Sequence, residues 1–266
     1  MDRFGGGPAN ASATLRAVLA SAARLQQVVP EAVLVGGAAA AWHAGHRESF
    51  DHDHVLTDLR DRYLDVLEAV EATEGWVTSV RASAPPLTLL GSLGGIEAGL
   101  RQLRRNRPLE MERVDLGAAG IVQVPTIEET LRIKAYLVVQ RNQVRDYLDV
   151  VAVADRLGVE RASGVLAGID DYYRDRSGGS DSVLTALVMR LSEPNPRDHR
   201  VTRQLASYKG LAARWQSWSA VEAACRDLAD RLLRAEEKSL DEGALERKSD
   251  HEQADEREPA GGERLD

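Results

Sequence analysis

Residues Val35 to His54 carry the most informative sequence of this chain, VGGAAAAWHAGHRESFDHDH. The apolar run that ends at Val35 is typical of a short buried strand, and Gly36-Gly37 indicates a tight turn into an alanine-rich helix. Gly45 closes that helix, and a second extended run follows from Phe50 to Leu56. The local order is therefore predicted to be strand, glycine turn, helix, strand.

Two acidic residues, Asp51 and Asp53, alternate along the second of these strands. Alternate side chains of a strand share a face, so we expect their carboxylates to lie close enough to bind one divalent cation. Mg²⁺ and Mn²⁺ suit such a pair, because hard cations combine one or two carboxylates with phosphate oxygens. The glycine turn before the helix would let backbone N–H groups approach a phosphate. An isolated Asp-x-Asp or Gly-Gly is common on surface strands and turns, and it is their spacing that favours a site.

A lysine further along the chain stands out because the sequence contains only four. Thr126 and Glu129 form a capping-box pattern that predicts a helix from Pro125-Thr126 to about Gln140. Lys134 falls on or beside the apolar stripe of this helix, where a solvated lysine is uncommon.

A second helix is predicted from about Asp146 to Leu157. Asp146 and Asp149 are i,i+3 neighbours on one of its faces. Asp146 could be a helix cap or first-turn acid, favoured by the helix dipole, or it could belong to a site. The sequence leaves both open.

These features occur in a fixed order along the chain. After the glycine pair come Arg-x-Ser-x-Asp-x-Asp at 47–53, Val-Pro-Thr-x-x-Glu with a helical lysine at 124–134, and Arg-x-x-x-Arg-Asp-x-x-Asp at 141–149. Together they resemble the AbiEii/AbiGii toxin-like nucleotidyltransferases, which have the minimal, polymerase-beta-like nucleotidyltransferase fold. The resemblance covers roughly residues 12–158. His52 and His54 depart from it, since apolar residues are expected at both positions.

The resemblance implies a role for each matching residue. Gly36 and Gly37 would hold a nucleoside triphosphate (NTP), with Arg47 and Ser49 as supporting nucleotide-binding residues. Lys134 would be a catalytic residue that contacts a phosphate, and Asp146 would be a catalytic residue near the acceptor or the base. The metal-binding acids would be Asp51 and Asp53, with a third acid for which Glu97 is the first candidate and Glu112 and Asp115 are rivals.

The implied reaction is attack of an acceptor hydroxyl on the α-phosphate of an NTP, assisted by Mg²⁺ or Mn²⁺. The implied acceptor is tRNA or another RNA. The implied setting is a toxin–antitoxin or phage-defence system with a cognate antitoxin protein as partner.

Three alternatives remain open at this point. The chain could be a nucleotide-binding or regulatory module of the same fold without turnover, or it could modify a small molecule such as an antibiotic. It could also be a metal-dependent hydrolase built on the histidine cluster His43, His46, His52 and His54. Against the last, His52 and His54 face away from the Asp pair if the strand is regular.

The rest of the chain completes an α+β prediction, a mixed sheet with flanking helices followed by a helical region. Short apolar runs between Trp76 and Pro125 indicate antiparallel strands that complete the sheet. We expect a flexible N-terminus at 1–11, a nucleotidyltransferase domain at 12–158, a helical C-terminal region at 159–234 and a disordered acidic tail at 235–266. The tail holds 12 acidic and 5 basic residues, which leaves 30 acidic and 29 basic residues before it.

The single cysteine, Cys225, cannot form an internal disulfide. The N-terminal sequence has no apolar stretch of the signal-peptide type, and no apolar run approaches the ~20 residues that cross a bilayer. We therefore expect a cytoplasmic protein with no membrane partner.

Overall fold

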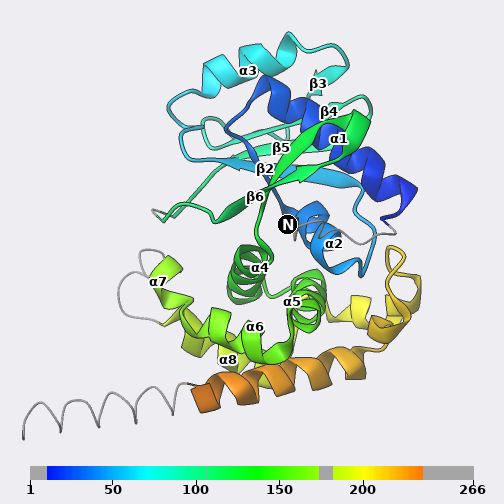
Figure 1. Cartoon of the computed structure of the whole chain (residues 1–266), viewed down its shortest axis with the longest axis vertical. Coiled ribbons are helices and arrows are strands. Elements are labelled where there is room, and N and C mark those ends of the chain that lie inside the picture. The colour runs from blue at the N-terminus through cyan, green and yellow to red at the C-terminus, as the bar shows by residue number, and fades with distance from the viewer. Residues whose placement is uncertain (1–10, 106, 174–181, 236–266) are drawn as a thin grey trace, which may run out of the picture.

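The computed structural model describes residues 11–105, 107–173 and 182–235. Within these ranges the chain is an α+β protein whose sheet half lies above a helical half in Figure 1. The expected flexible N-terminus and acidic tail fall almost wholly outside the described residues. No helix within the described ranges combines the length and the apolarity that crossing a bilayer requires.

A five-stranded mixed sheet forms the first half. Its strands are β1 Val33–Val35, β2 Asp51–Leu56, β3 Trp76–Thr78, β4 Thr88–Leu93 and β5 Ile96–Gln102. The spatial order is β1-β2-β5-β4-β3, with β2 and β5 parallel and the other neighbours antiparallel. The predicted antiparallel pairing is confirmed for β4 with β5, whereas the parallel pairing of β5 with β2 brings a later strand directly beside the Asp-x-Asp strand.

The last two predicted strands do not join this sheet. β6 Met111–Asp115 and β7 Ile121–Pro125 form a separate two-stranded antiparallel sheet, so the expectation that they complete the main sheet is wrong. A side chain of α1 (Ala13–Val28) provides hydrogen-bond partners for backbone groups at the free edge of β7. The Gln26 amide accepts from the Gln123 backbone N–H at 2.7 Å and donates to its carbonyl at 2.9 Å. A helix therefore takes the hydrogen bonds that another strand would otherwise make.

Three helices accompany the sheet: α1 Ala13–Val28, α2 Gly36–Ala44 and α3 Tyr63–Glu71. Ser12 caps α1, because its Oγ accepts from the Leu15 backbone N–H at 3.0 Å. Apolar side chains of α1 and α3 share one core with those of β3, β4 and β5. This core covers one face of the sheet and leaves the other to the helical half.

The helical half contains α4 Ile127–Arg141, α5 Val144–Leu157, α6 Val159–Ala167, α7 Asp170–Tyr173, α8 Val183–Ser192 and a last helix at 218–235. Thr126 caps α4 through the Glu129 backbone N–H, as the capping-box pattern predicts. The last helix runs beneath the others in Figure 1 and buries Val221, Cys225, Leu228 and Leu232 in the core that also contains α4 and α5. α4 and α5 therefore pack with the later helices. The domain boundary at residue 158 stays a prediction.

Candidate active site

Three acidic side chains lie on the two parallel strands at the centre of the sheet. Asp51 and Asp53 alternate along β2, and Glu97 stands opposite Asp51 in the register of β5. Residues paired in this way present their side chains on the same face. All three line a cleft of about 470 Å³. Glu112 and Asp115 are on β6, outside the main sheet and outside the residues that line this cleft.

Positive charge faces these carboxylates. Arg101, at the end of β5, places its Nε 3.3 Å from Asp53 Oδ1, and 45% of its side chain is exposed. Arg141 and Arg145 line the cleft from the ends of α4 and α5. The cleft thus combines three carboxylates from the sheet with three guanidinium groups, an arrangement that suits a cation and an oligophosphate together.

Two glycines make room for the Asp53 carboxylate. A Cβ at Gly99 would lie 2.4 Å from Asp53 Oδ1, which no side chain could tolerate without movement. Gly36 has φ +76° and faces Asp53 from the other side, with a Cβ position 3.4 Å from Oδ2. The positive φ requires glycine at the turn into α2. The predicted phosphate turn and the second acid are therefore in direct contact.

The second glycine has a different neighbourhood. A Cβ at Gly37 would meet Ser49 Oγ at 2.9 Å and an Arg47 guanidinium nitrogen at 3.0 Å. Ser49 in turn donates to Asp51 Oδ1 at 3.2 Å. Arg47 and Ser49, both buried, thus support the glycine turn and the first acid from behind.

Lys134 belongs to a buried cluster centred on Asp149 of α5. Its ammonium lies 2.8 Å from Asp149 Oδ2, and only 3% of the residue is exposed. Arg47 donates to both oxygens of Asp149, at 2.8 and 3.0 Å, and His46 Nε2 donates to Oδ1 at 2.8 Å. The structure thus pairs Lys134 with a carboxylate, and Lys134 is not among the residues that line the cleft. Its contact with a phosphate stays a prediction.

Electrostatics in this cluster favour a charged carboxylate. Burial disfavours the ionised form of Asp149, but the neighbouring charges of Arg47 and Lys134 outweigh it and hold the pKa of Asp149 well below its ordinary value. Burial lowers the pKa of His46, which keeps that imidazole neutral. The cluster therefore has two cations and one anion.

Asp146 occupies the first turn of α5, and Gln143 is the residue that precedes the helix. The interpretation of Asp146 as the helix cap is therefore wrong by three positions, whereas that of a first-turn acid is confirmed. Its side chain is buried and accepts from the cleft residue Arg141 at 3.0 Å. Burial raises the pKa of Asp146, opposed by the charges of Arg141 and Lys134. Asp146 thus lies one side chain behind the cleft.

The four clustered histidines point to different partners. His43 donates to the Pro125 carbonyl at 2.8 Å, and His46 binds Asp149. His52 Nε2 lies 3.0 Å from Ser21 Oγ of α1, and His54 packs edge-on against the His52 ring. As the strand alternation predicts, His52 and His54 are on the face of β2 opposite the Asp pair. This separation removes the basis for a histidine metal centre.

The donor set fits Mg²⁺ or Mn²⁺. The oxygens that Asp51, Asp53 and Glu97 offer in the cleft are hard ligands, and the glycine cradle leaves the Asp53 carboxylate room on both sides. Among the described residues, no three or more His, Cys, Asp or Glu side chains are placed to hold a metal ion by themselves. A metal ion here would take its remaining ligands from phosphate and water.

Two features of this site escaped the sequence analysis. Asp149 was noted only as a neighbour of Asp146, yet it is the anion that binds Arg47, His46 and Lys134. Arg101 was not assigned to the site at all. The buried position of Lys134, visible as a lysine on an apolar stripe, is the one signal that could have prompted a search for a buried anion.

No family model matches the sequence. Among curated proteins, it is similar to the probable transport protein MmpL11 of Mycobacterium bovis and the heme uptake protein MmpL11 of Mycobacterium tuberculosis, with 30% identity over 249 residues in each case. Each match takes in 84% of this chain and 23% of the relative. The mycolic acid-containing lipids exporter MmpL11 of Mycolicibacterium smegmatis is 34% identical over 131 residues, 49% of this chain and 13% of that protein. The chain therefore spans less than a quarter of these relatives.

Solved structures with a similar arrangement include two described in terms of nucleotide transfer. A proposed nucleotidyltransferase from H. pylori covers 83% of this chain and 96% of its own, with a TM-score of 0.45 and 11% identity. An antigenic nucleotidyltransferase-like protein from Paracoccidioides brasiliensis covers 66% and 94%, with a TM-score of 0.41 and 19% identity. At these scores the likeness by itself decides neither family nor activity.

Proposed function

We propose that this chain is a nucleotidyltransferase that moves a nucleoside monophosphate from an NTP to an acceptor hydroxyl. One observation carries the proposal. Asp51 and Asp53 on β2 and Glu97 on the parallel neighbour β5 face one cleft, directly beside the Gly36 turn that opens α2. A glycine turn at a helix N-terminus binds phosphate, and a carboxylate set next to it holds the cation that phosphoryl transfer requires.

The glycine turn beside the cleft and the side chains of the cleft itself each have a role in this reaction. The backbone of the Gly36-Gly37 turn would bind the triphosphate, and Arg101, Arg141 and Arg145 would neutralise its charge. The acceptor oxygen would bond to the α-phosphorus as the bond to the bridging oxygen breaks and pyrophosphate leaves, and the hydroxyl proton would pass to a cleft carboxylate. Mg²⁺ or Mn²⁺ held by Asp51 and Asp53 would stabilise the attacking and leaving oxygens. Glu97 would have to move to become a third ligand, because the three carboxylates are not grouped to hold an ion in the described part of the chain.

The buried cluster supports this cleft from behind. Arg47 joins Asp149 to the glycine turn, and Asp146 holds Arg141 at the edge of the cleft. Lys134 could reach a phosphate only by exchanging Asp149 for it. We therefore assign positioning roles to Arg47, Asp146 and Asp149, and a phosphate role to Lys134 only in a rearranged, nucleotide-bound state.

For the acceptor we propose RNA, with tRNA as the first choice. Two exposed arginines, Arg101 at the end of β5 and Arg107 in the chain that follows, could contact RNA phosphates, which would make binding salt-dependent. The resemblance in the motifs favours a toxin–antitoxin or phage-defence setting with a cognate antitoxin. Toxicity on expression, relieved by Asp53→Ala, would test that setting.

A second candidate is a nucleotide-binding module without turnover. It is favoured by one specific observation, the engagement of Lys134 with Asp149, which withholds this cation from the cleft. The similarity to part of much longer proteins named for transport fits a module of this kind, attached to another activity.

Labelling separates these functions. The purified chain is incubated with each α-labelled NTP, Mg²⁺ and total RNA, and we expect label on RNA that requires the metal and disappears on chelation. Asp53→Ala should abolish the label, whereas the matched surface change Asp65→Ala on α3 should not. Label on a small molecule alone would identify a different acceptor. If no RNA, protein or small molecule is labelled with any NTP, the transferase proposal fails and the binding module is retained.

A further inference from the structure

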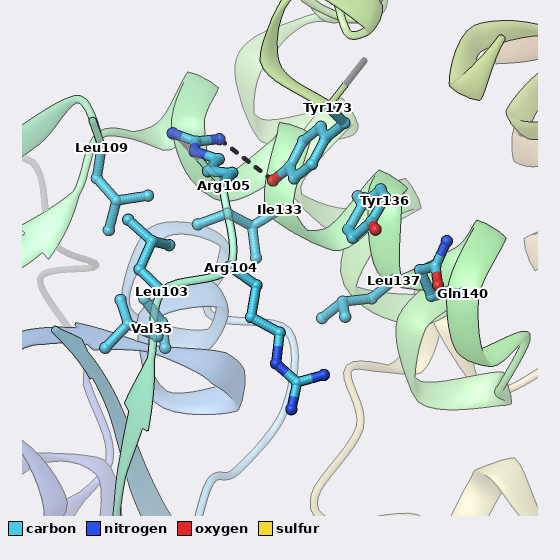
Figure 2. A pocket seen from close by; sticks show the side chains of 11 residues that line it. Val35, Leu103, Arg104, Arg105, Leu109, Ile133, Tyr136, Leu137, Gln140 and Tyr173 are labelled. Atoms are coloured by element: carbon cyan, nitrogen blue, oxygen red, sulfur yellow. Dashed lines mark hydrogen bonds between the residues drawn. The ribbon is translucent and has the colours of Figure 1, made fainter. Parts of the chain in front are cut away.

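A second hollow adjoins the acidic cleft, between α4 and the sheet (Figure 2). Its volume is about 290 Å³. We call it the ring pocket. Its walls are mainly apolar and include Val35, Val55, Leu103, Ile133 and Leu137. Tyr136 adds an aromatic wall that is already ordered, because its ring stacks on Tyr173 with centres 4.0 Å apart and planes within 5°.

Two segments place the ring pocket and the cleft side by side. On β2, Asp53 lines the cleft and Val55, two residues along the same face and therefore about 7 Å away, lines the ring pocket. At the end of β5, Arg101 lines the cleft and Leu103 the ring pocket. A ligand whose phosphates occupy the cleft can therefore place another part in the ring pocket.

Size and lining favour a flat two-ring group. A dry apolar cavity of about 150 Å³ accommodates benzene, so a hollow of 290 Å³ is large enough for two fused rings. Aliphatic side chains on the sheet side and Leu137 on the helix side present apolar surfaces suited to the faces of such a group.

Two exposed polar side chains could contact its edge. Figure 2 shows Arg104 reaching into the ring pocket from the chain that follows β5, with the Gln140 amide on the α4 side. Arginine pairs with the O6 and N7 of guanine, and glutamine with the N6 and N7 of adenine. Both pairings use N7, an atom that purines have and pyrimidines lack.

We infer that the ring pocket binds the purine base of the nucleotide whose phosphates lie in the cleft, with Arg104 and Gln140 as the residues that select it. The inference rests on the proposed function for the placement of the phosphates. It goes beyond that function because it names the class of NTP.

Equilibrium binding of ATP, GTP, CTP and UTP to the full chain with Mg²⁺ tests this inference. The purine nucleotides should bind at least about fivefold more tightly than the pyrimidine nucleotides, the difference expected of one well-placed base contact. Arg104→Gln and Gln140→Ala should each lower the affinity for a purine nucleotide, GTP or ATP. Each should therefore reduce the difference in affinity between purine and pyrimidine nucleotides. Both side chains are exposed, so neither change should unfold the protein. Arg113→Gln, an exposed arginine of β6 outside the ring pocket, is the matched control and should change nothing.

Binding of guanosine and adenosine to Asp53→Asn separates this inference from the proposed function. Nucleosides need neither the phosphate turn nor the metal, so their binding, and its loss in Arg104→Gln or Gln140→Ala, should persist where transfer is absent. Equal affinity for the four NTPs, or a purine preference that survives both substitutions, would overturn the ring pocket even if label transfer is observed. A purine preference without transfer would support purine binding in the ring pocket and contradict the proposed transferase activity.

Discussion

Asp149 is the residue on which the buried charge cluster behind the cleft depends. It is fully buried and is the common partner of Arg47, His46 and Lys134. Buried ion pairs contribute little net stability relative to an apolar core, yet removing one partner is costly because the others remain charged and unpaired. With Asp149 on α5, Lys134 on α4, and His46 and Arg47 in the turn after α2, the cluster joins three segments.

Replacing Asp149 by Asn should therefore destabilise the protein strongly. We expect a loss of about 3–5 kcal/mol in the free energy of unfolding, measured by urea denaturation, because two cations stay buried without a counter-ion. The control is Asp155→Asn, whose carboxylate pairs with Arg214 at the surface and should change the stability by less than about 1 kcal/mol. Equal effects of the two substitutions would contradict the role given to Asp149.

Among the elements, the parallel pair β2 and β5 determines the geometry of the cleft. β5 contributes Glu97 beside Asp51 and, two residues on, Gly99 beside Asp53. The Asp-x-Asp pattern on β2 and its flanking strand, turn and helix were predictable from local sequence. The partner strand was not, because pairing between segments more than 40 residues apart leaves no periodic signal in either one.

Gly99→Ala should test the space that β5 leaves for the metal-binding carboxylate. Its Cβ would collide with Asp53 Oδ1, so we expect transfer activity to fall sharply while circular dichroism shows the fold retained. Gly164→Ala provides the matched control in α6. Nothing lies within 4 Å of its Cβ position, and the change should stabilise the helix by about 0.5–1 kcal/mol without affecting transfer. Full activity in Gly99→Ala would place the reacting groups elsewhere.

At the scale of the whole molecule, four buried histidines make stability depend on pH. Burial lowers the pKa of His43, His46, His52 and His54, to about 4 for His52. In the unfolded chain these groups take up protons near their ordinary value of about 6.5. Stability contributed by the neutral forms is therefore complete above that pH and is lost as the pH falls toward the folded values. Carboxyl groups with a raised pKa, such as Asp146, act in the opposite direction.

His43→Gln should remove the contribution of one histidine to the pH dependence of stability. The glutamine amide can still donate to the Pro125 carbonyl but does not titrate. As the pH falls from 7.5 to 5, the difference in unfolding free energy between the variant and wild type should shift in favour of the variant by up to about 1–2 kcal/mol, measured from urea midpoints. A difference between the two proteins that stays constant over this range would show that His43 takes up its proton equally well in the folded state.

Local sequence was sufficient to predict the strand, glycine turn and helix around Gly36, the Asp51 and Asp53 pair on one face, the Thr126 cap and the inward position of Lys134. Each depends on residues within one turn of helix or a few strand positions of one another, where backbone geometry and side-chain periodicity act directly. The tertiary structure decided the rest. It placed β5 parallel to β2, moved β6 and β7 into a separate sheet, gave Lys134 a carboxylate as its partner and set the ring pocket beside the cleft. These outcomes depend on how distant segments share burial and charge, and no short window of sequence contains both partners.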